Sequence, residues 1–353
     1  MKRLSLILFA LALLLFAVGC EDTTTTYTPT PNVWTTVMTN LDFGFGKIWD
    51  GAGTGRLRIC GFNGVPQGNV MYYVPSSNDG GQGDPVYAGA QITDVSGLNR
   101  YAIWCSAKDS SAGRVYFYNG AGWLRNYCDE IFGGGVSSLT YKLYGVCVFE
   151  EGGIEHRIFV GEDGYILHYV EGSTGGGLGG VEGDQWHETT TSGGDDLYSV
   201  WGSDTAHLWA VGEDGVIYTY AGNYTWTTVT SPTSYDLHDI HGTTQGSAVY
   251  WYAVGENGTV LYYDSTNVTQ LTGLPTTSST LEAVFMLNAN RAITVGTNGY
   301  VLQTTTGSTG FSQTTGVTNK DCYGCFISSD GKNTYVATSD AVYDGTLIRL
   351  YQP

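Results

Sequence analysis

Basic residues are scarce in this chain. It has 15 lysines and arginines against 33 aspartates and glutamates, which gives a formal net charge of −18 at pH 7. Proteins that bind nucleic acids use clustered Lys and Arg to neutralise phosphates, so this balance argues against a nucleic-acid partner. The same acidic charge disfavours docking of the protein surface on anionic lipid headgroups.

Long apolar runs are also missing, apart from one at the N-terminus. Lys2 and Arg3 precede an apolar run of about fifteen residues, Leu4 to Val18, which is shorter than the roughly twenty that a spanning helix needs. This start is typical of a secretory signal peptide, which we predict over residues 1–19. Its ending, AVGC, resembles a bacterial lipobox, so we expect cleavage before Cys20 and acylation of Cys20, for example with palmitate. A plain signal peptide that ends near a chance cysteine is the alternative.

Residues 20–32 contain nothing to bury, because the segment EDTTTTYTPTPN is polar, rich in threonine and interrupted by proline. Such a composition is typical of a flexible tether. We therefore expect a folded domain over residues 33–353, held to a membrane by the lipid on Cys20. The expected location is the bacterial cell envelope, facing the periplasm or the cell exterior.

Helix-forming runs of Ala, Leu, Glu and Lys are absent from the rest of the chain, whereas Tyr, Thr, Val and Trp are abundant, as β-structure prefers. A short apolar–turn–apolar phrase recurs there: FVGEDGYILHY (159–169), AVGEDGVIYTY (210–220), AVGENGTVLYY (253–263) and TVGTNGYVLQT (294–304). Its Asp-Gly and Asn-Gly pairs tolerate positive φ at low cost. They therefore predict tight hairpin turns between two strands.

Further strands can be aligned on both sides of each phrase, which gives seven units at intervals of 41 to 51 residues. A period in this range indicates a repeat architecture. Four antiparallel strands per unit predict an all-β fold, a seven-bladed β-propeller. The last unit lacks a fourth strand, while NVWTTVM (32–38) matches the fourth strand of another unit, YTWTTVT (224–230), at Trp, Thr, Thr and Val. We therefore predict that the N-terminal strand 33–38 completes the last blade and closes the ring.

The text LYSVWGSDTAHLWAVGEDGVIYTYAGNYTW (197–226) resembles propeller repeats of bacterial exported proteins. These repeats are of the sialidase type or of the photosystem II assembly-factor type, and the resemblance extends from about residue 143 to residue 304. It implies a propeller fold and an extracytoplasmic binding or scaffolding role. It transfers no catalytic residue, because one fold serves many functions.

Three of the predicted turns carry acidic or amide residues on consecutive units, and we expect them on one face of the ring. An arc of negative charge at this position could attract a cation or a basic partner through its summed potential. The alternative is that these residues are only good turn formers. The candidate binding residues are Glu162, Asp163, Glu213, Asp214, Glu256 and Asn257.

Cysteine and histidine give weaker signals. After Cys20, an even number of cysteines permits up to three disulfides whose pairing the sequence leaves open: Cys60, Cys105, Cys128, Cys147, Cys322 and Cys325. The C-x-x-C at 322–325 has no second C-x-x-C and no following histidine, which favours a structural or paired role. His238 and His241 lie three apart on a predicted strand, a spacing that favours packing over metal binding. We predict no metal and no cofactor.

The sequence thus predicts a non-catalytic propeller that binds or scaffolds a protein or glycan partner. The alternative is a carbohydrate-active enzyme, similar to a glycoside hydrolase, that uses the central propeller pocket. A third possibility is a structural component of a surface layer or assembly. The enzyme is disfavoured because the arginines do not recur on the predicted inner strands, where groups that face the channel belong.

Overall fold

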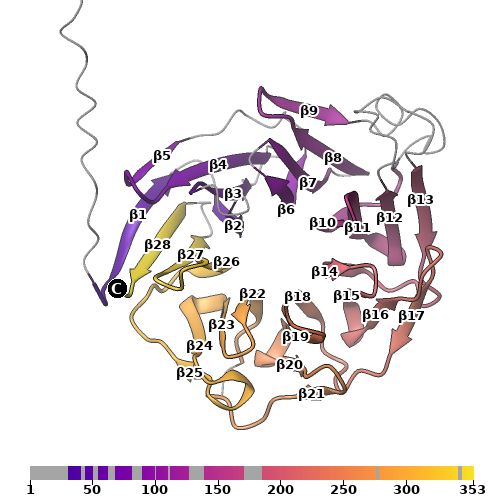
Figure 1. Cartoon of the computed structure of the whole chain (residues 1–353). Coiled ribbons are helices and arrows are strands. Elements are labelled where there is room, and N and C mark those ends of the chain that lie inside the picture. The colour runs from indigo at the N-terminus through magenta and orange to yellow at the C-terminus, as the bar shows by residue number, and fades with distance from the viewer. Residues whose placement is uncertain are drawn as a thin grey trace, which may run out of the picture.

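The strands of this protein form seven four-stranded antiparallel sheets around a central channel (Figure 1). The computed structural model describes residues 31–40, 44–50, 55–62, 68–81, 90–99, 101–109, 112–126, 139–170, 185–275, 278–340 and 344–353. The predicted seven-bladed β-propeller is therefore confirmed. The predicted signal peptide, Cys20 and the tether lie outside the described residues.

The blades follow one another along the chain, and each runs from an inner strand to an outer one. Blades 1 and 2 comprise β2 (Gly44–Trp49), β3 (Leu57–Phe62), β4 (Gly68–Val74), β5 (Asp79–Gly81), β6 (Gln91–Asn99), β7 (Ala102–Lys108), β8 (Gly113–Tyr118) and β9 (Trp123–Asn126). Blades 3 and 4 comprise β10 (Leu143–Glu151), β11 (Ile154–Gly161), β12 (Tyr165–Val170), β13 (Gln185–Thr190), β14 (Leu197–Asp204), β15 (His207–Gly212), β16 (Ile217–Tyr220) and β17 (Trp226–Val229).

Blades 5 and 6 comprise β18 (Leu237–Gln245), β19 (Ala248–Gly255), β20 (Val260–Tyr263), β21 (Val268–Gln270), β22 (Leu281–Asn288), β23 (Arg291–Gly296), β24 (Tyr300–Thr304) and β25 (Ser312–Gln313). Blade 7 comprises β26 (Asp321–Ile327), β27 (Asn333–Ser339), β28 (Gly345–Tyr351) and β1 (Trp34–Asn40). An aromatic residue such as Trp123, Trp226 or Phe311 predicts the start of a fourth strand in other units, whereas blades 1 and 5 end in short outer strands, β5 and β21, that have no aromatic first residue. The segment 74–91, VPSSNDGGQGDPVYAGAQ, is rich in glycine, which predicts an irregular insertion outside the repeat; strand β5 shows that this prediction is wrong for residues 79–81.

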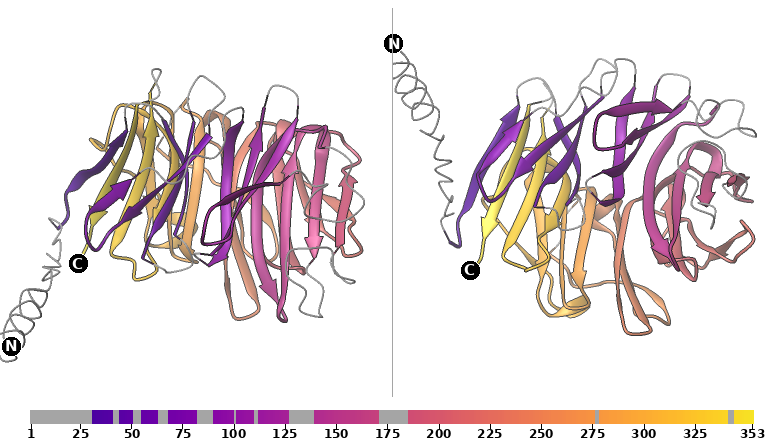
Figure 2. Two further views of the ribbon diagram at one scale, coloured as in Figure 1. Left: turned by 90° about the horizontal axis from the view of Figure 1, so that it is seen from above. Right: turned by 45° about the horizontal axis from the view of Figure 1, so that its top comes forward.

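The ring closes through β1, which pairs with β28 and brings Trp34 opposite Leu350. The predicted closure by an N-terminal strand is confirmed, and the strand covers residues 34–40 rather than 33–38. A bridge from Pro31 to Tyr351 and a hydrogen bond from the Asn32 N–H to the Tyr351 carbonyl extend the seam. The start of β1 and the C-terminus therefore lie on the same face of the ring (Figure 2).

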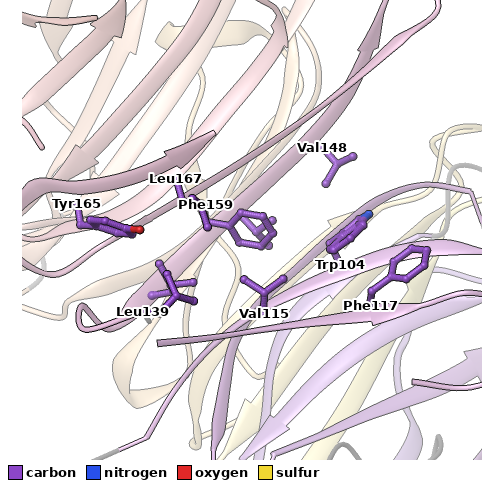
Figure 3. Packing of buried hydrophobic residues seen from close by; sticks show 10 residues of the cluster. Trp104, Val115, Phe117, Leu139, Val148, Phe159, Tyr165 and Leu167 are labelled. Carbon is purple, nitrogen blue, oxygen red and sulfur yellow. The ribbon is translucent and has the colours of Figure 1, made fainter. Parts of the chain in front are cut away.

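The hydrophobic core is divided among the spaces between neighbouring blades. Between blades 2 and 3, Trp104 stacks on Phe117 at 4.3 Å between ring centroids and meets Phe159 of the next blade edge-on (Figure 3). Trp104 and Phe159 are fully buried. Replacing such a ring by alanine costs about 3–5 kcal/mol, so each interface contributes a substantial share of the stability.

The repeated phrase forms the hairpin turn between the second and third strand of four blades. These turns are single 3-10 turns in blades 3 to 6: η1 (Glu162–Gly164), η2 (Glu213–Gly215), η3 (Glu256–Gly258) and η4 (Thr297–Gly299). A fifth such turn, η5 (Gly307–Thr309), follows β24. The Asp or Asn of each hairpin turn has a φ between 51° and 58°, and the glycine after it has a positive φ as well. The predicted left-handed hairpin turns are confirmed.

The five described cysteines are free and buried: Cys60, Cys105, Cys147, Cys322 and Cys325. Cys128 lies outside the described residues. Burial raises the pKa of the Cys60 thiol to about 12, so this thiol stays protonated. Cys322 and Cys325 do not pair with each other, which leaves the C-x-x-C with a packing role. No helix in the described part of the chain has the length and apolar character needed to cross a bilayer.

Candidate functional site

The inner strands β2, β6, β10, β14, β18, β22 and β26 surround the channel and run in the same direction (Figure 1). They begin on the face that carries η1 to η4, which we call the turn face. They end on the face where β1 begins and β28 ends, which we call the terminal face. A side chain near the start of an inner strand therefore belongs to one end of the channel, and a side chain further along belongs to the other end.

Each inner strand has an irregular register against its neighbour close to its start. The pairing shifts between Leu197 and Ser199 in β14 and between Leu237 and Asp239 in β18, and the same shift recurs in the other five blades. A β-bulge of this kind leaves one extra residue on the bulged strand and redirects the side chains beside it. Residues directly after the apolar residue at each shift, such as Tyr198 and Ser199 in β14, thereby line the channel.

Polar side chains from opposite sides of the ring meet in the middle of the channel. Lys47 of blade 1 forms an ion pair with Asp239 of blade 5, with 2.8 Å between Nζ and Oδ1. The Ser199 hydroxyl donates to Asp239 Oδ1 at 2.8 Å, and the Val284 N–H donates to Oδ2 at 2.9 Å. We call Lys47, Asp94, Ser199 and Asp239 the central layer. It separates two cavities, one at each end of the channel.

Asp94 completes the central layer and connects blades 2 and 3. Its two carboxylate oxygens accept the N–H groups of Val95 at 2.8 Å and Val146 at 3.0 Å. Burial raises the pKa of Asp94 to about 7, against the opposing effect of Lys47. Burial also lowers the pKa of Lys47, but the charges of Asp239 and Asp94 outweigh this effect and raise it, which keeps the lysine protonated. Through these contacts the layer connects residues of six blades, blades 1 to 6.

The cavity on the turn face, which we call the polar mouth, has a volume of about 660 Å³. Its polar and aromatic lining comprises Lys47, Gln91, Thr93, Lys108, Tyr144, Asp196, Tyr198, Asp236, His238, Glu256, Glu282 and Tyr323. Four of these residues are carboxylates, and Lys108 is the one lysine in the lining besides Lys47. The mouth therefore combines an excess of negative charge with three tyrosine rings.

Neighbouring blades are linked around the polar mouth by contacts between side chains. The rings of Tyr144 and Tyr198 meet edge-on at 5.8 Å, and Tyr198 meets His238 at 5.7 Å. His238 Nδ1 lies 2.9 Å from Glu282 Oε2. Burial lowers the pKa of His238, but the hydrogen bond and the charge of Glu282 outweigh this effect and raise it. Burial lowers the pKa of Lys108, whose Nζ lies 4.9 Å from the Tyr144 ring centroid.

The cavity on the terminal face, which we call the aromatic mouth, is smaller, with a volume of about 330 Å³. Large apolar and aromatic side chains line it, among them Trp49, Val148, Trp201, His241, Leu287, Phe285 and Phe326. His241 Nδ1 accepts the Met286 N–H at 3.1 Å, so its ring is neutral. Burial lowers the pKa of His241 to about 4. The central layer thus separates an acidic end of the channel from an end where large aromatic and aliphatic side chains lie beside Asp50, Ser96 and Ser329.

The acidic turns predicted as binding residues all lie on the turn face, and one of them, Glu256, lines the polar mouth. Glu162 forms an ion pair with Lys142 at 2.6 Å, whose hydrogen bond lowers the pKa of Glu162. Glu213 Oε2 accepts the Asp196 N–H at 3.3 Å. Asp163, Asp214 and Asn257 are exposed at the rim. The prediction that these six residues bind a partner stays a prediction.

The same turns also join neighbouring blades. The Asp163 N–H donates to Asp196 Oδ1 of the next blade at 2.9 Å, and the Asp214 N–H donates to Asp236 Oδ1 at 2.9 Å. The Asn298 N–H donates to Asp321 Oδ1 at 2.8 Å in blade 7. A structural role as turn formers and blade connectors is therefore visible for this part of the repeated phrase.

Sequence reasoning did not identify Lys47, Asp94, Asp239 and the tyrosines as residues of the channel. A common position is visible in the structure, because Lys47, Asp94 and Asp239 each lie two residues after the buried apolar residue at the register shift, which is Phe45, Ile92 or Leu237. The bulge also brings both His238 and His241 to the channel, at opposite ends. Strict alternation along a strand would have sent them to opposite faces of the blade.

Comparison with known proteins relates the fold to solved structures alone. The chain matches no protein-family model and no curated protein. YCF48 from Cyanidioschyzon merolae aligns with 90% of this chain and 98% of its own at a TM-score of 0.60 and 14% identity. YCF48 bound to D1 peptide aligns with 94% of this chain and 98% of its own, at a TM-score of 0.63 and 14% identity. The RRP9 WD40 repeats align with 93% of this chain and 100% of their own, at a TM-score of 0.68 and 8% identity. At these identities the likeness shows the propeller fold and no shared function.

Proposed function

We propose that this chain is a non-catalytic lipoprotein of the cell envelope that binds or scaffolds a partner at its polar mouth. The observation that carries the proposal is the open cavity of about 660 Å³, lined by three tyrosines and four carboxylates. Tyrosines supply large contact area and a hydroxyl group at small entropic cost, and an acidic surface attracts basic groups. A protein segment that carries lysine or arginine fits this lining, and a glycan is the alternative partner.

The structural likeness to YCF48 supports a protein partner, because one of the matched structures holds YCF48 with a D1 peptide bound. A propeller with a bound peptide is thus a precedent for this architecture. The precedent concerns the fold, and the residues of the polar mouth carry the proposal for this chain.

The proposed lipid anchor on Cys20 is compatible with an accessible polar mouth. Strand β1 begins on the terminal face, so the chain that leads back to Cys20 joins the propeller there. The turn face is the opposite face of the ring. An anchor attached through the terminal face leaves the polar mouth open to a partner.

The carbohydrate-active enzyme predicted as the alternative needs two carboxylates free to act on a glycosidic bond. Asp94 and Asp239 are the carboxylates of the central layer, and each of their oxygens accepts a hydrogen bond or an ion pair within the protein. These bonds favour a structural role for the pair. We therefore retain the non-catalytic proposal.

Site-specific photo-crosslinking tests the proposed binding face. Strand β14 carries Tyr198 at the polar mouth and Trp201 at the aromatic mouth, so a photoreactive phenylalanine derivative at either position forms a matched pair. We expect the full chain, irradiated in envelope extract of its source cell, to give one specific adduct from position 198 and none from position 201. Equal adducts from both positions, or an adduct from position 201 alone, contradict the proposal.

The anchor has a separate test. We expect an alkyne-tagged palmitate to label the wild-type chain in cells and to leave the Cys20→Ser variant unlabelled and released from membranes. Labelling that persists in the variant places the lipid elsewhere, and release without any labelling of the wild type contradicts the anchor.

A further inference from the structure

Three potential metal ligands converge on one wall of the polar mouth. Asp236 precedes β18, His238 is its second residue, and Glu256 begins η3. The pairing of Leu237 with Gly255, together with the hydrogen bond from the Glu256 N–H to the Asp236 carbonyl at 3.0 Å, brings the turn beside the start of the strand. One ligand atom from each side chain lies within 4.8 Å of the other two. We propose that Asp236, His238 and Glu256 bind a divalent transition-metal ion such as Zn²⁺.

The hydrogen bonding of His238 is the kind that prepares a histidine for a metal ion. Ligating histidines almost always place their second ring nitrogen against a carboxylate or a carbonyl, which fixes the ring orientation. His238 Nδ1 makes this contact with Glu282 Oε2 at 2.9 Å, across the boundary between blades 5 and 6. The other ring nitrogen, Nε2, is then the metal ligand. Glu282 is the residue that orients it.

Comparison with the equivalent turns in other blades indicates that the Glu256 side chain does not make the hydrogen bond that its counterparts make. Glu213 Oε2 accepts the Asp196 N–H in blade 4, and Thr297 Oγ1 accepts the Thr280 N–H in blade 6. Within the described residues, the Glu256 carboxylate accepts no such bond from the N–H of Asp236. It lies among the ligand atoms instead. Asp236 also keeps one oxygen, because Oδ1 accepts the Asp214 N–H and Oδ2 does not.

The donor set selects the class of metal. One imidazole and two carboxylates suit Zn²⁺ and similar transition metals, whereas Ca²⁺ and Mg²⁺ prefer oxygen ligands alone. Three donors within 4.8 Å of one another can reach zinc–ligand bonds of about 2.0–2.2 Å through small rotations, because the three side chains are partly exposed. A site with three protein ligands leaves a further coordination position for water or for a partner's side chain, on the side of the cavity.

A metal ion at this position is compatible with the proposed function but does not depend on it. The polar mouth holds four carboxylates, so a divalent cation lowers its negative charge without reversing it. Metal binding and partner binding therefore have independent readouts.

Isothermal titration of the EDTA-treated full chain with ZnCl₂ tests the site. We expect one Zn²⁺ per chain, with affinity at least tenfold lower in His238→Tyr and in Glu256→Gln. Tyrosine is the residue at the same position of blades 3, 4 and 7, so H238Y is a substitution that the fold already accommodates. Glu213→Gln, in the equivalent turn of blade 4, and His207→Asn, outside the mouth, are matched controls that should bind as the wild type does.

A second measurement guards against variants that misfold. Co²⁺ added to the wild type should give a visible absorption band that H238Y lacks, while the far-ultraviolet circular dichroism of the two proteins stays the same. The proposal is overturned by the absence of saturable Zn²⁺ binding, by equal affinities in H238Y and the wild type, or by Ca²⁺ binding as tight as Zn²⁺ binding. If Zn²⁺ fails to bind while position 198 still crosslinks a partner, the proposed metal site is wrong and the proposed function is still supported.

Discussion

The two mouths of the channel are lined by the same seven strands, yet they differ in chemistry. On β18, His238 belongs to the acidic polar mouth, where Glu282 raises its pKa. His241, three residues later, belongs to the aromatic mouth, where burial lowers its pKa to about 4. The difference shows that the position of a side chain along the inner strand, relative to the central layer, decides its environment. A repeat that looks uniform in sequence therefore builds two different surfaces.

The largest expected effect comes from breaking the central layer that keeps the two mouths apart. Lys47→Met leaves Asp239 without its cation in the middle of the channel. Removing one partner of a buried ion pair costs about 3–5 kcal/mol, so we expect a loss of this size in the free energy of unfolding, measured with urea. Lys108→Met, which removes a lysine from the polar mouth without breaking an ion pair, should cost less than about 1 kcal/mol. Equal losses in the two variants would show that the layer is not a brace.

Substitutions at two glycines of blade 4 test how closely the backbone is packed on the turn face and on the terminal face. Gly215, in the turn face, has a φ of 74°, and a Cβ there would lie 2.5 Å from the Thr233 carbonyl oxygen of the chain leading to blade 5. Gly222, in the terminal face, has a φ of 86° and no atom within 4 Å of such a Cβ. Gly222→Ala should cost about 1–2 kcal/mol from backbone strain alone. Gly215→Ala should cost about 2 kcal/mol more, because backbone must also move. Similar melting temperatures for the two variants contradict the idea that the turn face is the more tightly joined.

The pH dependence of stability should report the environment of His241. The pKa of His241 in the folded protein is about 4, below the usual 6.5. The contribution of the neutral His241 ring to the free energy of unfolding is therefore fully present above pH 6.5 and is lost as the pH falls toward 4. Because the ring is partly exposed, we expect a loss on the order of 1 kcal/mol. His241→Asn keeps an acceptor for the Met286 N–H but cannot take up a proton in this range. Its unfolding free energy should therefore fall less steeply than that of the wild type, and parallel curves would refute this assignment.

The smallest expected effect concerns the charges at the rim of the polar mouth. Neutralising Glu213 and Asp214 together should reduce partner capture by about two- to fivefold at low salt, since each exposed charge contributes less than about 1 kcal/mol. The difference should disappear at high salt, where the charges are screened. Asp264→Asn, an exposed turn residue of the terminal face, is the control and should capture partner as the wild type does. Unchanged capture by the double variant at low salt rejects a role for these turns.

The architecture was predictable because its signals are local and repeated. Asp-Gly and Asn-Gly pairs specify a hairpin whichever blade they occupy, and the match between residues 33–38 and a fourth strand identified the seam of the ring. The outer strands β5 and β21 were missed since they are short and lack an aromatic first residue. Length and composition carry little information about such strands.

The channel was much less predictable than the fold. Lys47 meets Asp239 only because ring closure places blade 1 opposite blade 5, and a pairing across the ring leaves no trace in the spacing of either residue. The bulge at the start of each inner strand adds a second difficulty, because it changes which side chains face inward by one position. The acidic turns, by contrast, stood out in the sequence, although Glu162 and Glu213 are engaged in contacts with the start of their own blades.

The seam between β1 and β28 also determines how the protein responds to pulling. A force applied through the chain before residue 31 reaches the contacts of Pro31 and Asn32 with Tyr351 first and the Trp34–Leu350 pair next, because these contacts are at the end of the seam where the chain enters. The remaining pairs are then loaded one after another, as in a zipper, rather than together. A propeller pulled from its N-terminal side is therefore mechanically weakest at the strand that closes it, and such a force opens blade 7 before it loads any other blade.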